Sequence, residues 1–232
     1  MAVARHGREG GRHVETTFVV PLWVDLVAVG VGALQGALFA GRLKERRIDL
    51  LGVALIGVVV GLGGGLLRDI LLNELPVAMR TNWFLLVAVG AALLGMLLQR
   101  LFNRLNALII ALDAVTIGLF AAIGTSKALL VVGVPEIPAI FVGIVSAVGG
   151  SILRDVSLNL PIALMHVGSL YAVAAGAGTV LLVALWSFDV DIVIASIACA
   201  VVTTVIRLGS VRYGWSLPEQ RAIGSWRVWR RA

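Results

Sequence analysis

Seven long apolar segments, interrupted only by short charged or proline-containing breaks, constrain this chain more than any other feature. Each is close to the roughly 20 residues that a helix needs to cross a lipid bilayer. Only 14% of the residues are charged and the mean hydropathy is +1.01, whereas a soluble domain carries about 25% charged residues. The chain is therefore predicted to be an all-α polytopic membrane protein.

The breaks between the apolar segments set the expected limits of the helices. GRLKERRID is charged, VGVPEIP holds two prolines and SFDVD is acidic. The expected spans are 22–40, 50–72, 83–99, 107–125, 138–158, 167–186 and 190–207. We expect one membrane domain over 22–207, preceded by an N-terminal tail of residues 1–21 and followed by a basic cytoplasmic tail of residues 208–232.

Lysine and arginine are distributed unevenly between the two sides that these spans define. The first loop, the third loop and the C-terminal tail lie on one side and carry most of them. Because cytoplasmic loops are enriched in Lys and Arg, we expect the C-terminus in the cytoplasm and the N-terminus outside. The same bias accounts for the net charge of +6. A nucleic-acid partner is not predicted, since the basic residues do not alternate with aromatics on a soluble fold.

Few residue types that carry enzyme chemistry are present. Cys199 is the single cysteine, so neither a disulfide framework nor a cysteine-based metal site is available. The three histidines have no metal-ligand spacing, and no Ser-His-Asp constellation is suggested. We therefore predict no catalytic residues, no metal and no cofactor.

One motif occurs twice within the apolar segments. GLGGGLLRDILLNELP, residues 61–76, and AVGGSILRDVSLNLP, residues 147–161, align without a gap from Gly63–Asn73 to Gly149–Asn159. An aspartate also heads each half, as Asp25 and Asp113. The repeats are then 22–100 and 107–186, with a seventh helix over 190–207 left unpaired. Because each repeat has an odd number of spans, the two must be inverted in the membrane, the plan of many transport proteins.

The charges of the repeats are the main candidate site residues. A charge deep in a bilayer costs about 2.5–3.5 kcal/mol on insertion scales, so it usually faces a partner or a wet cavity. The inversion predicts that Arg68 pairs with Asp25 near the outer face, and that Arg154 pairs with Asp113 near the inner face. Asp69 and Asp155 complete the set of motif charges.

Two interpretations of the motif remain open. The glycines Gly63, Gly64 and Gly65, and their counterparts Gly149, Gly150 and Ser151, either kink the helix and free carbonyls for a cation or let helices pack closely. Likewise, each Arg-Asp pair either lines a polar path or clamps two helices together.

Three further polar residues are candidates for the mouth or the lining of a path. Lys127, at the outer end of its span, either tunes cation entry or extends to the membrane interface. Asn73 and Asn159 either end their helices or line the path.

The doubled Gly-Gly-x-x-x-Arg-Asp motif, the leading aspartates and the three-plus-three-plus-one order resemble the prokaryotic branch of the trimeric intracellular cation (TRIC) channel family. The resemblance covers residues 22–207. It implies a homotrimer in the plasma membrane, with one pore in each protomer lined by spans one, two, four and five. It also implies kinks at the glycine motifs, and potassium or sodium ions as the conducted partners.

The sequence departs from the family pattern at two places. Ser151 replaces the third glycine of the second motif, and the Phe-Ala-x-x-Gly stretch, intact at residues 120–124, is GALQG at residues 32–36. These changes, Gln35 included, bear on the pore wall rather than on the fold.

The main alternative function is a secondary transporter of a small solute that uses the same inverted repeats, because fold alone does not dictate function. A scaffolding membrane protein is disfavoured by the doubled charges. Membrane lipid is a further expected partner, through the basic tail.

Overall fold

The computed structural model describes residues 21–43, 48–101, 106–165 and 170–216, and these are helical with no β-strand among them. Both predicted tails lie largely outside the described residues, as does His166. The elements are α1 (Leu22–Gly41), α2 (Leu50–Leu71), α3 (Val77–Arg80), α4 (Trp83–Leu101), α5 (Asn106–Lys127), the π-helix η1 (Ala128–Val132), α6 (Glu136–Ser157), the 3₁₀ turn η2 (Ala163–Met165), α7 (Tyr171–Ser187) and α8 (Ile192–Tyr213).

The seven predicted membrane helices are present. The stretches Leu22–Gly41, Leu50–Leu71, Asn106–Val132, Glu136–Ser157 and Ile192–Tyr213 are long and apolar enough to cross a membrane. Two shorter apolar stretches, Trp83–Gln99 and Tyr171–Ser187, supply the third helix of each repeat. Aspartates cap the N-termini of α2 and α8. The Asp49 side chain accepts a hydrogen bond from the backbone N–H of Gly52, and the Asp191 side chain accepts one from the backbone N–H of Val193. These N-caps satisfy amides that lack a partner inside the helix.

Two helices extend further than the sequence analysis expected. The helix that begins at Asn106 continues through η1 to Val132 rather than ending at 125, and α8 runs to Tyr213 rather than to 207. Each ends at a glycine in the left-handed region, Gly133 at φ 67° and Gly214 at φ 65°, the usual way for a helix to stop. Arg207, the last residue of the expected span, therefore lies well inside α8.

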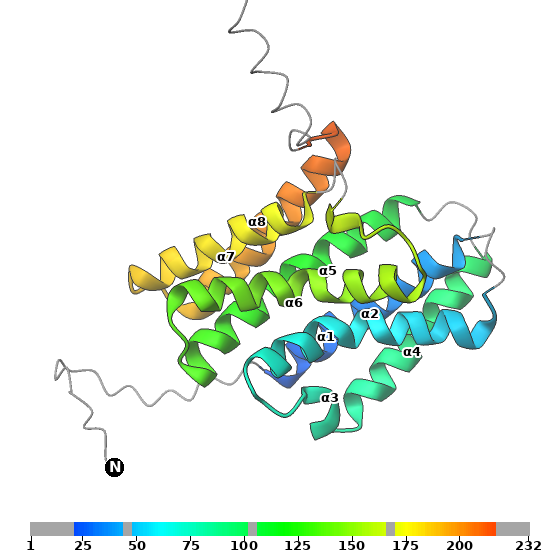
Figure 1. The fold of residues 1–232 in the computed structure, drawn as a ribbon, viewed down its shortest axis with the longest axis horizontal. Helices are drawn as coiled ribbons and strands as arrows, with labels where there is room; N and C mark the ends of the chain where they lie inside the picture. Colours follow the sequence, from blue (N-terminus) through cyan, green and yellow to red (C-terminus); the bar gives the residue numbers. More distant parts are fainter. Residues whose placement is uncertain (1–20, 44–47, 102–105, 166–169, 217–232) are drawn as a thin grey trace, which may run out of the picture.

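The helices form two groups of three (Figure 1). α1, α2 and α4 pack together, as do α5, α6 and α7, and the groups meet along α2 and α6 in the middle of the molecule. α8 packs on α5 and α7 and has no counterpart in the first group. This is the predicted architecture of two three-helix repeats plus one extra helix.

The two groups are inverted relative to each other. The end of α5 lies beside the end of α2, since Lys127 contacts Asp69. The end of α6 lies beside the end of α1, since Arg154 stacks on Phe39. The start of α1 lies at the α2 end, because Asp25 contacts Arg68. α1 therefore runs opposite to α5, and α2 opposite to α6.

Polarity is arranged as expected for a protein surrounded by lipid. Large apolar side chains such as Trp23 and Ile137 are exposed on the outside. Among the described residues, the two largest fully buried side chains are arginines, Arg68 and Arg154. Because lipid does not solvate charge, the interior of the bundle is the place where these charged groups find partners.

Candidate functional site

The first cluster consists of Asp25, Arg68, Asp69 and Lys127, drawn from the start of α1 and the ends of α2 and α5. Arg68 Nε donates to Asp69 Oδ1 at 2.8 Å, and its Nη1 lies 3.5 Å from Asp25 Oδ1. Lys127 Nζ donates to Asp69 Oδ1 at 2.7 Å. All four residues are buried. The predicted pair of Arg68 with Asp25 is present, and the expectation that Lys127 extends to the membrane interface is wrong, because Asp69 holds it inside.

The second cluster consists of Asp113, Arg154, Asp155 and Arg207, from α5, α6 and α8. Arg154 Nε donates to Asp155 Oδ1 at 2.9 Å, and its Nη1 lies 3.9 Å from Asp113 Oδ1, the second predicted pair. Arg207 Nη2 donates to Asp113 Oδ2 at 3.3 Å. Gln35 Nε2 donates to the other oxygen, Oδ1, at 3.3 Å. Both oxygens of Asp113 are therefore engaged.

Aromatic rings complete the second cluster. The guanidinium carbon of Arg154 lies 3.9 Å from the centre of the Phe39 ring, and that of Arg207 lies 3.6 Å from the centre of the Tyr171 ring. Cation–π contacts of this kind stabilise a desolvated arginine. Sequence reasoning did not include Arg207 among the site residues because the expected span ended at this arginine. Within α8, burial distinguishes Arg207 from Arg212, which is exposed.

The two clusters occupy opposite ends of α1 and α5. The separation of Asp25 and Phe39 along α1 equals that of Asp113 and Lys127 along α5. At a rise of 1.5 Å per residue, each pair is roughly 20 Å apart along its helix. Each helix therefore gives an aspartate to one cluster and a second side chain to the other. Each cluster holds two aspartates and two cations, so neither has a net charge. Buried charges require this pairing, because an unpaired ion in an apolar interior is strongly destabilising.

The aspartate of each Arg-Asp pair also organises the loop that follows its helix. Asp69 Oδ2 accepts from the backbone N–H of Val77 at 2.9 Å, at the start of α3. Asp155 Oδ2 accepts in the same way from Ala163 at 2.9 Å, at the start of η2. This clamping role supports the structural interpretation of the Arg-Asp pairs, and the matching Asn and Pro that close both motif copies are its sequence signal.

Asn73 and Asn159 end their helices. Their φ angles are 53° and 47°, in the left-handed region where asparagine is tolerated better than most residues. Both are exposed, and each follows the last turn of the helix that carries a motif. In this conformation they terminate α2 and α6 rather than line an internal path.

Between the two clusters, α2 and α6 cross at their glycines, a contact we call the glycine seam (residues 63–64 and 149–150). A Cβ on Gly63 would lie 2.8 Å from Leu153 Cδ1 and 3.2 Å from Gly150 Cα. A Cβ on Gly64 would collide with the Ser146 carbonyl oxygen. Both helices continue unbroken through these positions. The seam thus fits the packing interpretation, and no unwound turn is present here.

Gly65 differs from the other motif glycines. A Cβ placed on it would meet only ordinary contacts, Arg68 Nη2 at 3.8 Å and Phe120 Cε1 at 4.0 Å. Its counterpart Ser151 carries a side chain whose hydroxyl donates to the Val148 carbonyl at 2.8 Å. Gly65 is therefore not required for packing, because a methyl group would fit at this position without a close contact.

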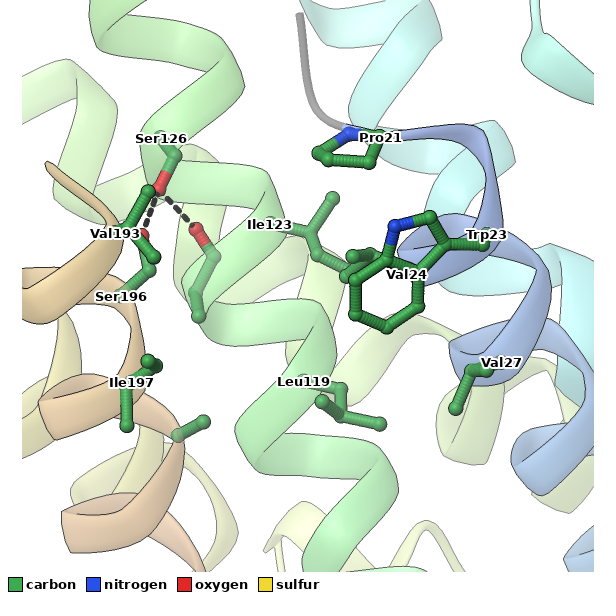
Figure 2. A pocket seen from close by; sticks show the side chains of 12 residues that line it. Pro21, Trp23, Val24, Val27, Leu119, Ile123, Ser126, Val193, Ser196 and Ile197 are labelled. Carbon is green, nitrogen blue, oxygen red and sulfur yellow. Dashed lines mark hydrogen bonds between the residues drawn. The ribbon is translucent and has the colours of Figure 1, made fainter.

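A separate apolar pocket of about 320 Å³ opens between α1, α5 and α8. Figure 2 shows Trp23 and Val27 on one side of it and Val193 and Ile197 on the other. The hydroxyls of Ser126 and Ser196 are hydrogen-bonded at 2.7 Å and join α5 to α8. None of the lining residues is charged, so this pocket suits an apolar group rather than an ion.

Comparisons with known proteins agree with this architecture. The model of the family described as "Glycine transporter" matches residues 22–100 and 110–187, and the chain belongs to this family. The UPF0126 inner membrane protein YadS of Escherichia coli K12 is 37% identical over 200 residues, covering 84% of this chain and 94% of that protein. A UPF0126 membrane protein of Vibrio cholerae is 34% identical over 199 residues, covering 84% and 80%.

Solved structures of TRIC channels share the fold. The TRIC orthologue from Rhodobacter sphaeroides superposes with a TM-score of 0.76 at 29% identity, covering 83% of this chain and 97% of that one. A second structure, described under conductance through TRIC cation channels, gives 0.74 at 27% identity, covering 87% and 98%. The resemblance to the prokaryotic TRIC channels is thereby confirmed.

Proposed function

We propose that this chain forms a channel for monovalent cations, permeable to potassium and sodium. The observation that carries the proposal is the pair of buried clusters at opposite ends of α1 and α5, in the fold of solved cation channels. Ionisable side chains inside a membrane bundle support this proposal, because they are costly there and commonly line ion or substrate pathways. The clamping role of the Arg-Asp pairs is compatible with a position beside such a path.

In the proposed path, ions pass between α1, α2, α5 and α6. Asp25 and Asp113 supply one carboxylate near each end, and such carboxylates favour cations. The glycine seam lies between them and is tightly packed in this conformation. Conduction therefore requires α2 and α6 to separate or to kink at residues 63–65 and 149–151. The small residues at these positions have little or no side chain to obstruct an ion.

The proposed assembly is a homotrimer with one pore in each protomer, in the plasma membrane of a prokaryote. The TRIC neighbours are described as trimeric channels, and the E. coli relative as an inner membrane protein. The uneven distribution of Lys and Arg supports an external N-terminus and a cytoplasmic C-terminus, which places the first cluster toward the outside. Membrane lipid surrounds the apolar outer face.

Recording of purified protein in a planar bilayer under a potassium gradient tests this proposal. The expected result is unitary currents that reverse near the potassium equilibrium potential. A silent bilayer, with protein shown to be folded and oligomeric, would contradict it. Leucine at Gly64 and Gly150 is unsuitable as a probe of gating, because even a Cβ there collides with backbone of the facing helix.

A second candidate function is the transport of a small solute such as glycine. The description of the matching family favours it, and so does the presence of both signs of charge in each cluster. A transporter would expose the first and second clusters in turn, on either side of the closed seam. Saturable uptake of labelled glycine into proteoliposomes, without unitary currents, would favour this candidate over the channel.

A further inference from the structure

We propose that the apolar pocket between α1, α5 and α8 is a binding site for the hydrocarbon tail of a membrane lipid. The pocket lies beside the first cluster, because its lining residues Val24 and Ser126 directly precede Asp25 and Lys127 in the chain. The proposal concerns the outer, lipid-facing side of the bundle. It holds whether the protein conducts ions or transports a solute.

The rims of the pocket face the surroundings of the bundle. Trp23 and Val27 form the rim on α1, Val193 and Ile197 form the rim on α8, and all four are exposed. The floor is formed by α5, where Ile123 is buried. In a membrane, exposed apolar side chains of this kind contact lipid tails, which are as apolar as leucine. The medium that reaches this pocket is therefore hydrocarbon.

The pocket also has the direction and the size of a lipid tail. α1 and α8 both pack on α5, and all three helices are long and apolar enough to cross a membrane. The lining residues lie within 21–27, 119–126 and 193–200, roughly 10 Å of each helix. The pocket therefore runs along the membrane-crossing helices, as lipid tails do. Its volume of about 320 Å³ is about twice that of a ~150 Å³ apolar cavity that holds benzene.

The hydroxyl groups in the pocket have no hydrogen to offer a polar ligand. Ser126 Oγ donates its hydrogen to the Ala122 carbonyl oxygen at 2.8 Å. A hydroxyl has a single hydrogen, so Ser196 is the donor in the 2.7 Å bond between the two serines. Both hydrogens are used inside the protein, and no lining residue is charged. An amino acid, a sugar or an ion would lose its hydration here without replacement, whereas a hydrocarbon tail needs none.

Trp23 is the remaining lining residue with a polar side-chain group. It lies at the start of α1 and is exposed. Tryptophans at the ends of membrane helices sit at the level of the lipid headgroups, with the ring against hydrocarbon and the indole N–H toward polar groups. A tail that lies between α1 and α8 therefore has its polar end at Trp23 and its methylene groups over Ile123 and Leu119. This arrangement favours a lipid over a hydrocarbon without a polar end.

Photolabelling of the purified full-length protein in lipid vesicles tests the proposal. The vesicles consist of phosphatidylethanolamine and phosphatidylglycerol, with a trace of a phosphatidylcholine that carries a diazirine on one tail. We expect severalfold more label on residues 119–126 and 193–200 than on 201–211, which carry exposed apolar side chains of α8 outside the pocket. Ala200→Phe fills the pocket. Val201→Phe is the matched control, because Val201 is exposed on the same helix but does not line the pocket.

In Ala200→Phe, the label on the two pocket segments should fall to the level of 201–211, and in Val201→Phe it should equal that of the wild type. Thermal unfolding shows whether each variant is folded. If Ala200→Phe is not, Val27→Phe narrows the same pocket from α1. Label spread evenly over α8 in the wild type, or unchanged in a folded variant with a filled pocket, would overturn the inference. So would an unlabelled pocket in which a photoreactive residue at Ile197 cross-links to a second copy, because the pocket would then be a contact between subunits.

Discussion

The first and second clusters are built from the same motif but are completed differently. In the first, Lys127 bonds to Asp69. At the equivalent position of the other repeat, Phe39 stacks on Arg154 instead. In the second, α8 adds Arg207 to Asp113, and Asp25 receives no such cation among the described residues. The repeated motif therefore places the same charged residues in both clusters. Residues outside the motif determine how many partners those charges have in each cluster.

This difference makes the first cluster the more loosely paired of the two. In the first cluster Asp25 has one ion-pair contact among the described residues, to Arg68 at 3.5 Å, whereas in the second cluster both oxygens of the corresponding aspartate, Asp113, are engaged. In the proposed path, the second end is then the more tightly closed of the two in this conformation. Variants of the two ends test this comparison.

The largest effect is expected from Asp69→Ala. It leaves Arg68 and Lys127 buried without their shared acceptor and frees the Val77 amide, so the free energy of unfolding should fall by about 3–5 kcal/mol. Asp155→Ala should cost less, because one cation rather than two loses its partner. Denaturant titration in mixed micelles measures both, and equal losses would show that Lys127 adds nothing to the first cluster.

Lys127→Met removes one cation and leaves Asp69 bonded to Arg68 and Val77. The expected loss is about 1.5–3 kcal/mol, the range for a hydrogen bond to a charged group. The matched control is Phe39→Met, which tests the equivalent position of the second cluster without removing a charge. An unchanged melting temperature for Lys127→Met would place this lysine outside the stabilising network.

A smaller difference in stability is expected between alanine substitutions at two adjacent glycines, Gly64 and Gly65. A methyl on Gly64 collides with the backbone of α6, whereas one on Gly65 has room. Because both changes bring the same gain in helix propensity, Gly64→Ala should be less stable than Gly65→Ala by about 1–3 kcal/mol, the cost of overpacking. Melting temperatures that coincide would mean that the seam is looser than described.

The smallest effect is expected for the surface pair of Arg80 and Glu74, which are 44% and 33% exposed. Exposed ion pairs contribute about 0–1 kcal/mol, so Arg80→Ala should barely move the unfolding transition. A loss comparable to that of Lys127→Met would contradict the view that burial sets the strength of these pairs.

Much of this architecture could be predicted from the sequence, for specific physical reasons. Hydropathy located the seven helices, and the odd number of spans in each repeat implied the inversion. The inversion in turn paired Arg68 with Asp25 and Arg154 with Asp113. These inferences rest on patterns that lie within one repeat or that the symmetry relates.

The remaining features depend on contacts that break the symmetry. Arg207 comes from the unpaired helix, and Gln35 reaches Asp113 across the boundary between the repeats. Lys127 likewise crosses to a helix of the other repeat. The different packing of Gly64 and Gly65 depends on where α6 crosses α2, which no spacing within one helix reveals.

The most direct test of a single path with two unequal ends is the unitary potassium conductance of the wild type, Asp25→Asn and Arg207→Gln. Asp25→Asn removes the loosely held carboxylate, so conductance should fall. Arg207→Gln releases an oxygen of Asp113 from its cation, so conductance should rise. Changes in the same direction, or no unitary current from folded wild-type trimers, would contradict the account.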